Sequence, residues 1–209
     1  MPVRHDDTSA RRHRPHDWHS EAYVDDWIKH DAARNDERRP RLQRMVALAP
    51  FPHDAAISVL DVGAGYGVVT EEVLRAFPSA RVTLQDYSDV MLDRARQSLA
   101  HAAAQLRYVL CDLTDPSWTK RVGGPFDLAV SAIAIHNLRD LAKIGECYRS
   151  ICQVLKPSGC FLDYDRFEPA GGIAAHERLL RAAGFARVER AWEQSAVAII
   201  AACKVANSE

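Results

Sequence analysis

Short apolar runs alternate with amphipathic stretches along most of the chain. Residues 57–62 (Ile-Ser-Val-Leu-Asp-Val) are apolar and β-branched, which predicts a buried strand, and residues 68–77 follow with apolar side chains at helical spacing. Further strands are predicted over 81–86 and 105–111, separated by a helix that begins after Ser88, a residue suited to cap a helix N-terminus. Strands that alternate with helices predict a parallel sheet with crossover connections.

The second half of the chain continues this alternation and ends in two strands without a helix between them. We expect a strand over 128–131, a helix over about 138–155, a strand over 160–164, a helix over 174–183, and strands over 185–192 and 195–204. A tight connection near 193–194 predicts that the last two strands pair antiparallel. The fold class is therefore α/β: a doubly wound, mostly parallel seven-stranded sheet with a C-terminal antiparallel hairpin and N-terminal covering helices.

The N-terminal quarter of the chain differs in composition from the rest. Residues 1–17 are polar, basic and rich in histidine, which is typical of a disordered leader. Residues 18–52 place scattered apolar side chains in a charged background and fit two helices, with Pro40 at or near the start of the second. We expect a single domain over 18–209, in which the helices of 18–52 cover a core formed by 53–209.

Charge and cysteine usage narrow the class of protein. The formal net charge is −1 over 209 residues, so no global field attracts nucleic acid or a membrane surface, and no apolar run is long enough to span a bilayer. The cysteines show neither C-x-x-C spacing nor a disulfide framework. We therefore expect a cytoplasmic protein with free, mostly buried thiols at Cys111, Cys147, Cys152, Cys160 and Cys203.

A glycine-rich turn follows the first strand. The pattern is Asp61-x-Gly63-x-Gly65-x-Gly67, and glycines there allow a sharp turn and the close approach of a ligand to the backbone. The spacing differs from the G-x-G-x-x-G of dinucleotide sites, which argues against a nicotinamide oxidoreductase. Asp61 would repel a pyrophosphate, but it could hold an ammonium group directly or through water.

Polar residues also stand at the ends of the following strands. Asp86, Asp112 and Ser131 each close a predicted strand, and ligands of open α/β sheets bind outside the carboxyl ends of the strands. Asp86 lies 19 residues beyond Gly67, where an acid can accept hydrogen bonds from both hydroxyls of a ribose. Each residue alone could be a turn or cap residue, but together they indicate one elongated ligand site.

Five ordered motifs between residues 20 and 204 resemble those of the class I S-adenosylmethionine (SAM) dependent methyltransferases: the Asp61 glycine turn, Asp86-Tyr-Ser-x-x-Met91, Cys111-Asp112-Leu113, Pro125–Ser131 and Leu155–Leu162. The resemblance implies the Rossmann-like methyltransferase fold, SAM as cofactor and S-adenosylhomocysteine (SAH) as product. It implies that Tyr87 and Met91 flank the adenine, with Asp112 at its amino group. The implied cofactor-binding residues are Asp61, Gly63, Ala64, Gly65, Gly67, Asp86, Tyr87, Met91, Cys111, Asp112, Leu113 and Ser131.

Three residues are candidates for a catalytic role. His136, in the run Ile-Ala-Ile-His-Asn-Leu that resembles bacterial small-molecule methyltransferases, could act as a general base, or it could only orient a loop. Tyr23 shares a helical face with Trp27 and either lines the acceptor pocket or packs on the sheet. Asp163 stands near the mouth of the site, but it and Asp165 lack further ligands for a metal, so no metal is expected.

The expected function is transfer of a methyl group from SAM to an O, N or C atom of a small-molecule acceptor, in specialised metabolism. The alternative is a SAM-fold protein that does not methylate, such as a SAM- or SAH-binding subunit. No Asn/Asp-Pro-Pro-Tyr tetrad supports nucleic acid as the acceptor, and the arginine-rich stretch 34–44 is expected to be a solvated face. The short segment 166–176 predicts either an open pocket or one completed by a second subunit, as in a homodimer.

Overall fold

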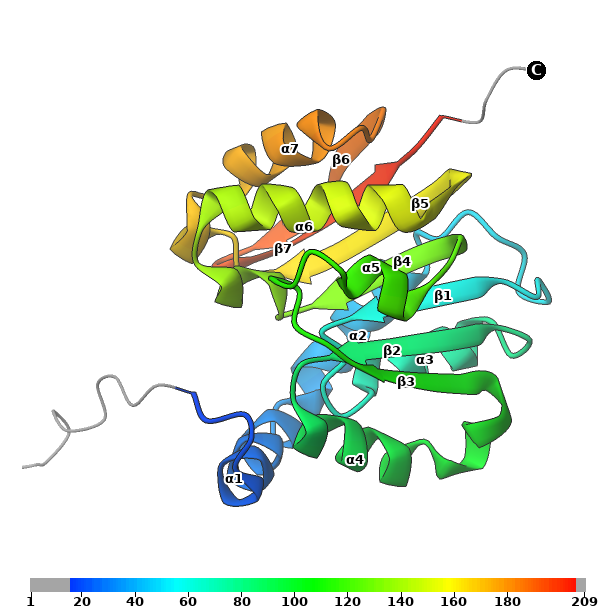
Figure 1. The fold of residues 1–209 in the computed structure, drawn as a ribbon, viewed down its shortest axis with the longest axis vertical. Coiled ribbons are helices and arrows are strands. Elements are labelled where there is room, and N and C mark those ends of the chain that lie inside the picture. The colour runs from blue at the N-terminus through cyan, green and yellow to red at the C-terminus, as the bar shows by residue number, and fades with distance from the viewer. Residues whose placement is uncertain (1–15, 206–209) are drawn as a thin grey trace, which may run out of the picture.

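A computed structural model describes residues 16–205, so the expected leader over 1–17 lies outside the described residues except for His16 and Asp17. Within 16–205 the strands form one sheet of seven, in the order β3-β2-β1-β4-β5-β7-β6 (Figure 1). The first five strands run parallel, and β7 is antiparallel to both of its neighbours. The predicted fold class is therefore confirmed. The strands are β1 Ser58–Val62, β2 Arg81–Asp86, β3 Leu106–Leu110, β4 Phe126–Ala132, β5 Leu155–Asp165, β6 Arg187–Gln194 and β7 Val197–Cys203.

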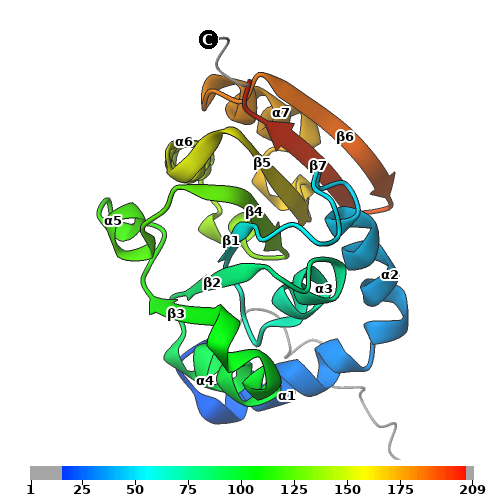
Figure 2. The same ribbon diagram turned by 90° about the vertical axis from the view of Figure 1, so that its right-hand side faces the viewer.

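Helices cover both faces of the sheet, and each face has its own apolar cluster (Figure 2). Helices α2, α3 and α4 contribute to the cluster around Val59 and Leu128, and α5, α6 and α7 contribute to the cluster around Leu60 and Phe161. The α-helices are α1 Glu21–Ala32, α2 Asn35–Val46, α3 Val68–Ala76, α4 Asp89–Ser98, α5 Trp118–Val122, α6 Leu141–Val154 and α7 Ile173–Ala182, and the 3₁₀ turns are η1 Ala100–Gln105, η2 Ile135–Leu138 and η3 Glu168–Ala170.

Two helix ends follow the local signals of the sequence. The hydroxyl of Ser88 accepts a hydrogen bond from the backbone N–H of Met91 at 3.0 Å, as expected of a cap at the start of α4. Gly184 has φ +106° just beyond α7, and the N–H of Phe185 donates to the carbonyl of Leu180 at 3.3 Å. This is the Schellman arrangement, in which a left-handed glycine closes the last turn.

The position of Pro40 differs from the prediction. Helix α2 begins at Asn35, so Pro40 lies inside the helix rather than at its start. A proline there removes one helical hydrogen bond. Tertiary contacts support α2 at this point, since Arg39 donates to the buried carboxylate of Glu72 on α3 at 2.9 Å. Ion pairs between residues far apart in the sequence cannot be predicted from the local pattern of apolar and polar residues.

Two cysteines also differ from the prediction. Cys160 on β5 lies opposite Cys203 on β7, and their sulfurs form a disulfide, so the expectation of free thiols is wrong for this pair. The antiparallel register of two strands that are 43 residues apart in sequence creates the contact. Cys111, Cys147 and Cys152 are free and buried, as expected. Over the described part of the chain, none of the helices has the length and apolar character needed to cross a membrane.

Candidate functional site

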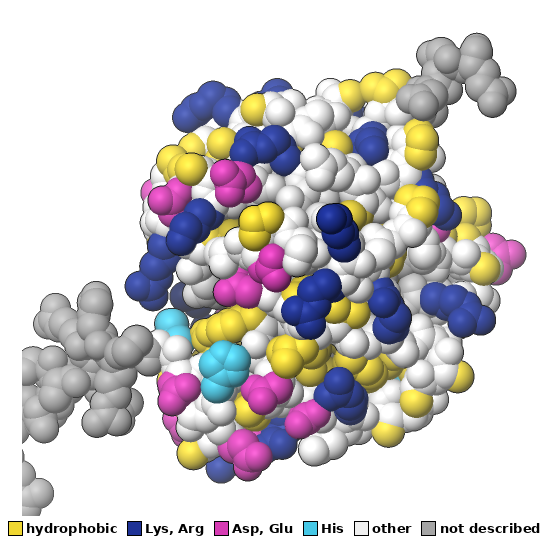
Figure 3. All heavy atoms as spheres, in the orientation of Figure 1, with side chains coloured by type: hydrophobic (Ala, Val, Ile, Leu, Met, Phe, Trp, Pro, Cys, Tyr) yellow, Lys and Arg dark blue, Asp and Glu magenta, His cyan; other side chains and the backbone are white. Residues whose placement is uncertain are grey.

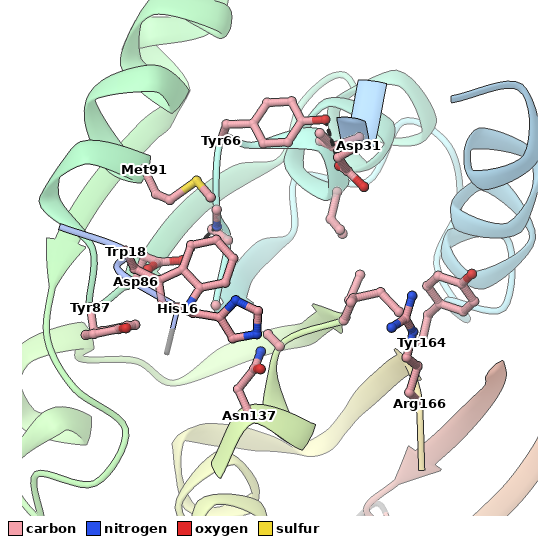
Figure 4. A pocket seen from close by; sticks show the side chains of 18 of the residues that line it. His16, Trp18, Asp31, Tyr66, Asp86, Tyr87, Met91, Asn137, Tyr164 and Arg166 are labelled. Atoms are coloured by element: carbon pink, nitrogen blue, oxygen red, sulfur yellow. Dashed lines mark hydrogen bonds between the residues drawn. The ribbon is translucent and has the colours of Figure 1, made fainter. Parts of the chain in front are cut away.

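An elongated cavity of about 550 Å³ lies where the carboxyl ends of the parallel strands meet the N-terminal helices. Asp86, Tyr87 and Met91 stand at one end of it, and Tyr164 and Arg166 stand at the opposite end (Figure 4). Ends of parallel strands are the usual position of ligand sites in open α/β sheets. Of the predicted cofactor residues, eight line this cavity: Gly63, Ala64, Gly65, Asp86, Tyr87, Met91, Asp112 and Leu113.

The glycine turn presents one open position to the cavity. Gly65 has φ +54°, and the nearest atom that a Cβ there would meet is the sulfur of Met91 at 4.0 Å. The other two glycines serve the fold, because a Cβ on Gly63 would lie 2.4 Å from that of Ala134 and a Cβ on Gly67 would lie 2.6 Å from Leu99. Only Gly65 therefore leaves room at the cavity for a close-fitting ligand.

The carboxylate of Asp86 is held beside the glycine turn by backbone donors. Its two oxygens accept hydrogen bonds from the N–H of Gly65 at 2.8 Å and the N–H of Ser88 at 2.9 Å. The side chain is 8% exposed, and burial raises the pKa of this carboxyl while the backbone hydrogen bonds oppose the rise. Each carboxylate oxygen can still accept a further hydrogen bond from a ligand hydroxyl.

The sequence analysis missed Gln85, which lines the same cavity. Its side-chain oxygen accepts from the N–H of Gly63 at 3.0 Å, and its nitrogen donates to the carbonyl of Cys111 at 2.6 Å. One amide thus joins the glycine turn to the end of β3. An amide side chain in a strand predicted to be buried was the available signal, because buried amides need partners.

The first helix covers the end of the cavity near Asp86. Arg94 on α4 donates to both carboxylate oxygens of Asp25 on α1, at 2.8 and 3.0 Å, and the hydroxyl of Ser88 donates to the carbonyl of Trp18. Trp27 lines the cavity and meets the ring of Tyr66 edge-on. The ion pair between Arg94 and Asp25 thus holds α1 against α4 at this end of the cavity.

Four predicted cofactor residues do not line the cavity. Gly67 packs on Leu99, Cys111 contributes its carbonyl to Gln85, and the hydroxyl of Ser131 donates to the carbonyl of Val62 at 3.0 Å. Asp61 is fully buried beneath the turn and accepts from the hydroxyl of Thr70 at 2.6 Å.

The second oxygen of Asp61 has no hydrogen-bond partner among the described residues. Burial, together with the nearby charge of Asp86, raises the pKa of Asp61 to about 7, although the Thr70 hydroxyl opposes the rise. An unpartnered buried oxygen directly behind the glycine turn is available to a donor on a ligand.

None of the three predicted catalytic residues lines the cavity. Tyr23 contacts the ring of His16 instead. Nδ1 of His136 lies 2.6 Å from the buried carboxylate of Asp165, which also accepts the backbone N–H of His136 at 3.0 Å. The next two residues, Asn137 and Leu138, do line the cavity.

Asp163 belongs to a separate buried network under α6 and α7. It lies 3.0 Å from the hydroxyl of Tyr148, which lies 2.7 Å from Nδ1 of His176. Burial and the nearby Asp165 raise the pKa of Asp163 well above its usual range, and burial lowers the pKa of His176. Both shifts favour the neutral forms of these groups, as burial of a carboxyl and an imidazole does.

The arginine-rich stretch 34–44 forms the predicted solvated face only in part, because Arg34 and Arg44 are exposed whereas Arg38, Arg39 and Arg41 are partly buried. Arg34, Arg38 and Arg41 line the cavity. Arg38 pairs with the buried Asp31 and also donates to the hydroxyl of Tyr66 at 2.8 Å, and its side chain is only 13% exposed. The α2 helix turns this side of the stretch toward the sheet, which the charge pattern alone did not indicate.

Two side chains at the cavity stand on strained backbone. Ile133, just beyond β4, and Arg139, just beyond η2, have φ values of +54° and +56°. Non-glycine residues rarely adopt this left-handed conformation, and each costs about 1–2 kcal/mol. Such strain concentrates at functional sites, so the loop after β4 is consistent with one.

Comparison with known proteins places this site in a family. A family model described as a methyltransferase domain matches residues 59–159. The release factor glutamine methyltransferase of Chlorobaculum tepidum is 43% identical over 76 residues, which are 35% of this chain and 26% of that protein. The N-demethylindolmycin N-methyltransferase of Streptomyces griseus is 29% identical over 143 residues, which are 68% of this chain and 58% of that protein. The chain thus spans less than two thirds of the length of these relatives.

The fold comparison agrees with the sequence matches. The solved structure of an O-methyltransferase family protein from Burkholderia thailandensis has a TM-score of 0.73 at 17% identity, covering 92% of this chain and 62% of that one. At this identity the likeness shows the fold alone. The matched residues 59–159 contain the glycine turn, Asp86 and Asp112, and together with these relatives they identify this part of the chain as a class I SAM-dependent methyltransferase domain.

Proposed function

We propose that this protein transfers the methyl group of SAM to a small-molecule acceptor. The observation that carries the proposal is the position of Asp86, whose carboxylate is fixed beside the open Gly65 at one end of a cavity that continues well beyond it. One end then suits the donor, and the remaining length is available to an acceptor.

The residues at the donor end fit the chemistry of SAM. Asp86 can accept hydrogen bonds from both ribose hydroxyls, and Gly65 leaves the backbone accessible. Tyr87 and Met91 offer a ring and a polarisable sulfur to the adenine, and Asp112 keeps one carboxylate oxygen available because Thr114 occupies only the other.

The methionine end of SAM has a candidate partner in Asp61. Its unpartnered buried oxygen stands directly behind the glycine turn and suits an ammonium group, directly or through a water molecule. The remaining predicted cofactor residues, Gly67, Cys111 and Ser131, would act by shaping the turn and the strand ends around these contacts.

Methyl transfer depends chiefly on the alignment of the acceptor atom with the methyl carbon. Bound SAM supplies an electrophilic methyl group on a cationic sulfur. Ala132, Ile133 and Ala134 form an apolar wall next to the donor end, which keeps water from the reacting atoms. We keep His136 as the candidate base, although its side chain does not line the cavity: it directly precedes the lining residue Asn137, and Asp165 holds its Nδ1, so the base role requires Nε2 to reach the proton of a hydroxyl or amine acceptor.

Incubation with trideuteromethyl SAM tests the proposed function. The protein and the labelled donor are added to a metabolite extract, and mass spectrometry follows the label. We expect SAH to accumulate together with at least one product that carries the label, and neither to form with Asp86→Asn. SAH binding without labelled product or SAH formation would contradict methyl transfer and favour a SAM-binding protein of another kind.

A further inference from the structure

The far end of the cavity is lined by cations that have no acidic partner. Arg41, Arg139, Lys143 and Arg166 all face the cavity, and none of them forms an ion pair with an Asp or Glu of the described residues. Figure 3 shows Lys and Arg side chains along the left edge of the molecule, above the histidines there. Among the described residues that line the cavity, six Lys or Arg side chains stand against four acids, so positive charge is in excess.

These cations come from separate parts of the chain and line the same cavity, and Arg41 and Arg166 stand beside Tyr164 at its far end. Arg41 lies on α2, Arg139 and Lys143 follow β4, and Arg166 follows β5. In Figure 4 the guanidinium group of Arg166 lies beside Tyr164, across the cavity from Asp86. Convergence from three segments differs from a solvated run of charge, in which neighbouring residues point into solvent.

Arg41 is fixed in place rather than freely solvated. It donates to the buried hydroxyl of Tyr164 at 3.4 Å, and its guanidinium group lies 5.5 Å from the ring centre of Trp192. Both partners are neutral, so they orient the cation without neutralising its charge. A held cation with an unmet charge is suited to a carboxylate or phosphate, which a guanidinium group binds through paired hydrogen bonds.

Most of the other charged groups of the cavity either form ion pairs or lie near the donor end. Arg34 and Arg38 share the carboxylate of Asp31, and Asp86 and Asp112 lie toward the donor end. Glu168 lies outside the main cavity, in an adjoining hollow that Arg41 and Arg166 also line, and it forms no ion pair with either arginine. Arg41 and Arg166 therefore keep an unpaired charge at the end of the cavity away from Asp86.

We infer that the acceptor is an anion, with a carboxylate or phosphate group that Arg41 and Arg166 bind and that Arg139 and Lys143 attract. This inference rests on the proposed function, because it names the substrate class of the same site. Unpaired cations in a cleft also raise the local concentration of anions and speed their association. Neutral molecules of the same shape would leave these cations unpaired in the bound complex.

Binding of simple anions to the SAH complex tests the inference. Calorimetry with inorganic phosphate, benzoate and benzamide is performed on wild-type protein, on the double variant Arg41→Gln/Arg166→Gln, and on Lys143→Gln. Arg44→Gln is the matched control, because Arg44 is exposed on the same helix and does not line the cavity. Comparing the affinities for phosphate and benzoate distinguishes a phosphate site from a carboxylate site, and benzamide is the neutral counterpart of benzoate.

We expect saturable binding of phosphate or benzoate, weakened roughly 10- to 100-fold in the double variant and less in Lys143→Gln, with Arg44→Gln unchanged. SAH affinity should stay the same in all variants. The inference is overturned if neither anion binds, if benzamide binds as well as benzoate, or if the double variant loses SAH affinity, which would assign these arginines to the donor. Failure of the wild-type protein to bind SAH would instead overturn the proposed function.

Discussion

Two glycines of the same turn should respond to alanine in opposite ways. Gly65 opens onto the cavity, whereas Gly67, at the start of α3, packs against Leu99. Both have positive φ, so an alanine at either position costs about 1–2 kcal/mol in backbone strain. What distinguishes the two variants is the surroundings of the new Cβ.

The contacts set the expected magnitudes. In Gly65→Ala the nearest atom lies 4.0 Å away, so the loss of stability should stay near the strain alone. The new methyl group occupies space that a close-fitting donor needs, and overpacking of 1–3 kcal/mol lowers SAH affinity roughly 10- to 100-fold. In Gly67→Ala the Cβ would lie 2.6 Å from Leu99, a core residue, so the total loss of stability reaches about 2–5 kcal/mol.

Urea unfolding and calorimetric titration with SAH separate these effects. We expect Gly65→Ala to be nearly as stable as wild type and to bind SAH poorly. Gly67→Ala should be strongly destabilised yet bind SAH within a few-fold of wild type at a temperature where it is folded. The reasoning is refuted if Gly65→Ala binds SAH normally, or if Gly67→Ala loses affinity while keeping its stability.

Three further predictions concern single residues. Because burial raises the pKa of Asp61 to about 7, the folded chain keeps a proton there that the unfolded chain loses above about pH 4. The stability that Asp61 contributes should therefore be complete below pH 4 and be lost as the pH rises through 7, by at most about 4 kcal/mol. Urea unfolding of the wild-type protein and of Asp61→Asn at several pH values should show this trend. A difference in stability between the two proteins that does not depend on pH would contradict it. Arg139→Gly should be more stable than Arg139→Ala by about 1 kcal/mol, because glycine relieves the positive φ; equal urea midpoints would argue against strain at this position. His136→Asn should lower kcat roughly 10²- to 10⁴-fold and leave SAH affinity unchanged, since a general base acts on the chemical step; an unchanged kcat and pH profile would assign His136 a structural role.

The main outline of the fold could be predicted because its signals are local. The apolar run that ends at Asp61 and the glycines after it define a strand and a turn whatever the rest of the chain does. The strand that ends at Asp86 and the Ser88 cap of α4 were recovered for the same reason. The short helix over 118–122 was missed, because five residues carry too little periodicity to separate a helix from a loop.

The features that escaped prediction depend on contacts between distant segments. The Cys160–Cys203 disulfide needs the register of β5 against β7, and Gln85 becomes important only once β1, β2 and β3 lie side by side. The sequence around Arg41 does not distinguish it from an exposed arginine, because its contact with Tyr164 forms only when α2 packs against β5. Residue type and spacing can thus indicate the donor end of the site, whereas the acceptor end depends on tertiary structure.

The most direct test of the central claim is calorimetric titration of SAH into wild-type protein and the Asp86→Asn variant. Asp89→Asn serves as the matched control, because that acid lies three residues beyond Asp86, is exposed at the start of α4 and lies outside the cavity. Hydrogen bonds to a charged acceptor contribute about 1.5–3 kcal/mol each, so the loss of two corresponds to a fall in affinity of roughly 10²- to 10⁴-fold. The account predicts micromolar binding to wild type and Asp89→Asn and almost none to Asp86→Asn, whereas absence of binding to wild type, or equal affinity in Asp86→Asn, would contradict it.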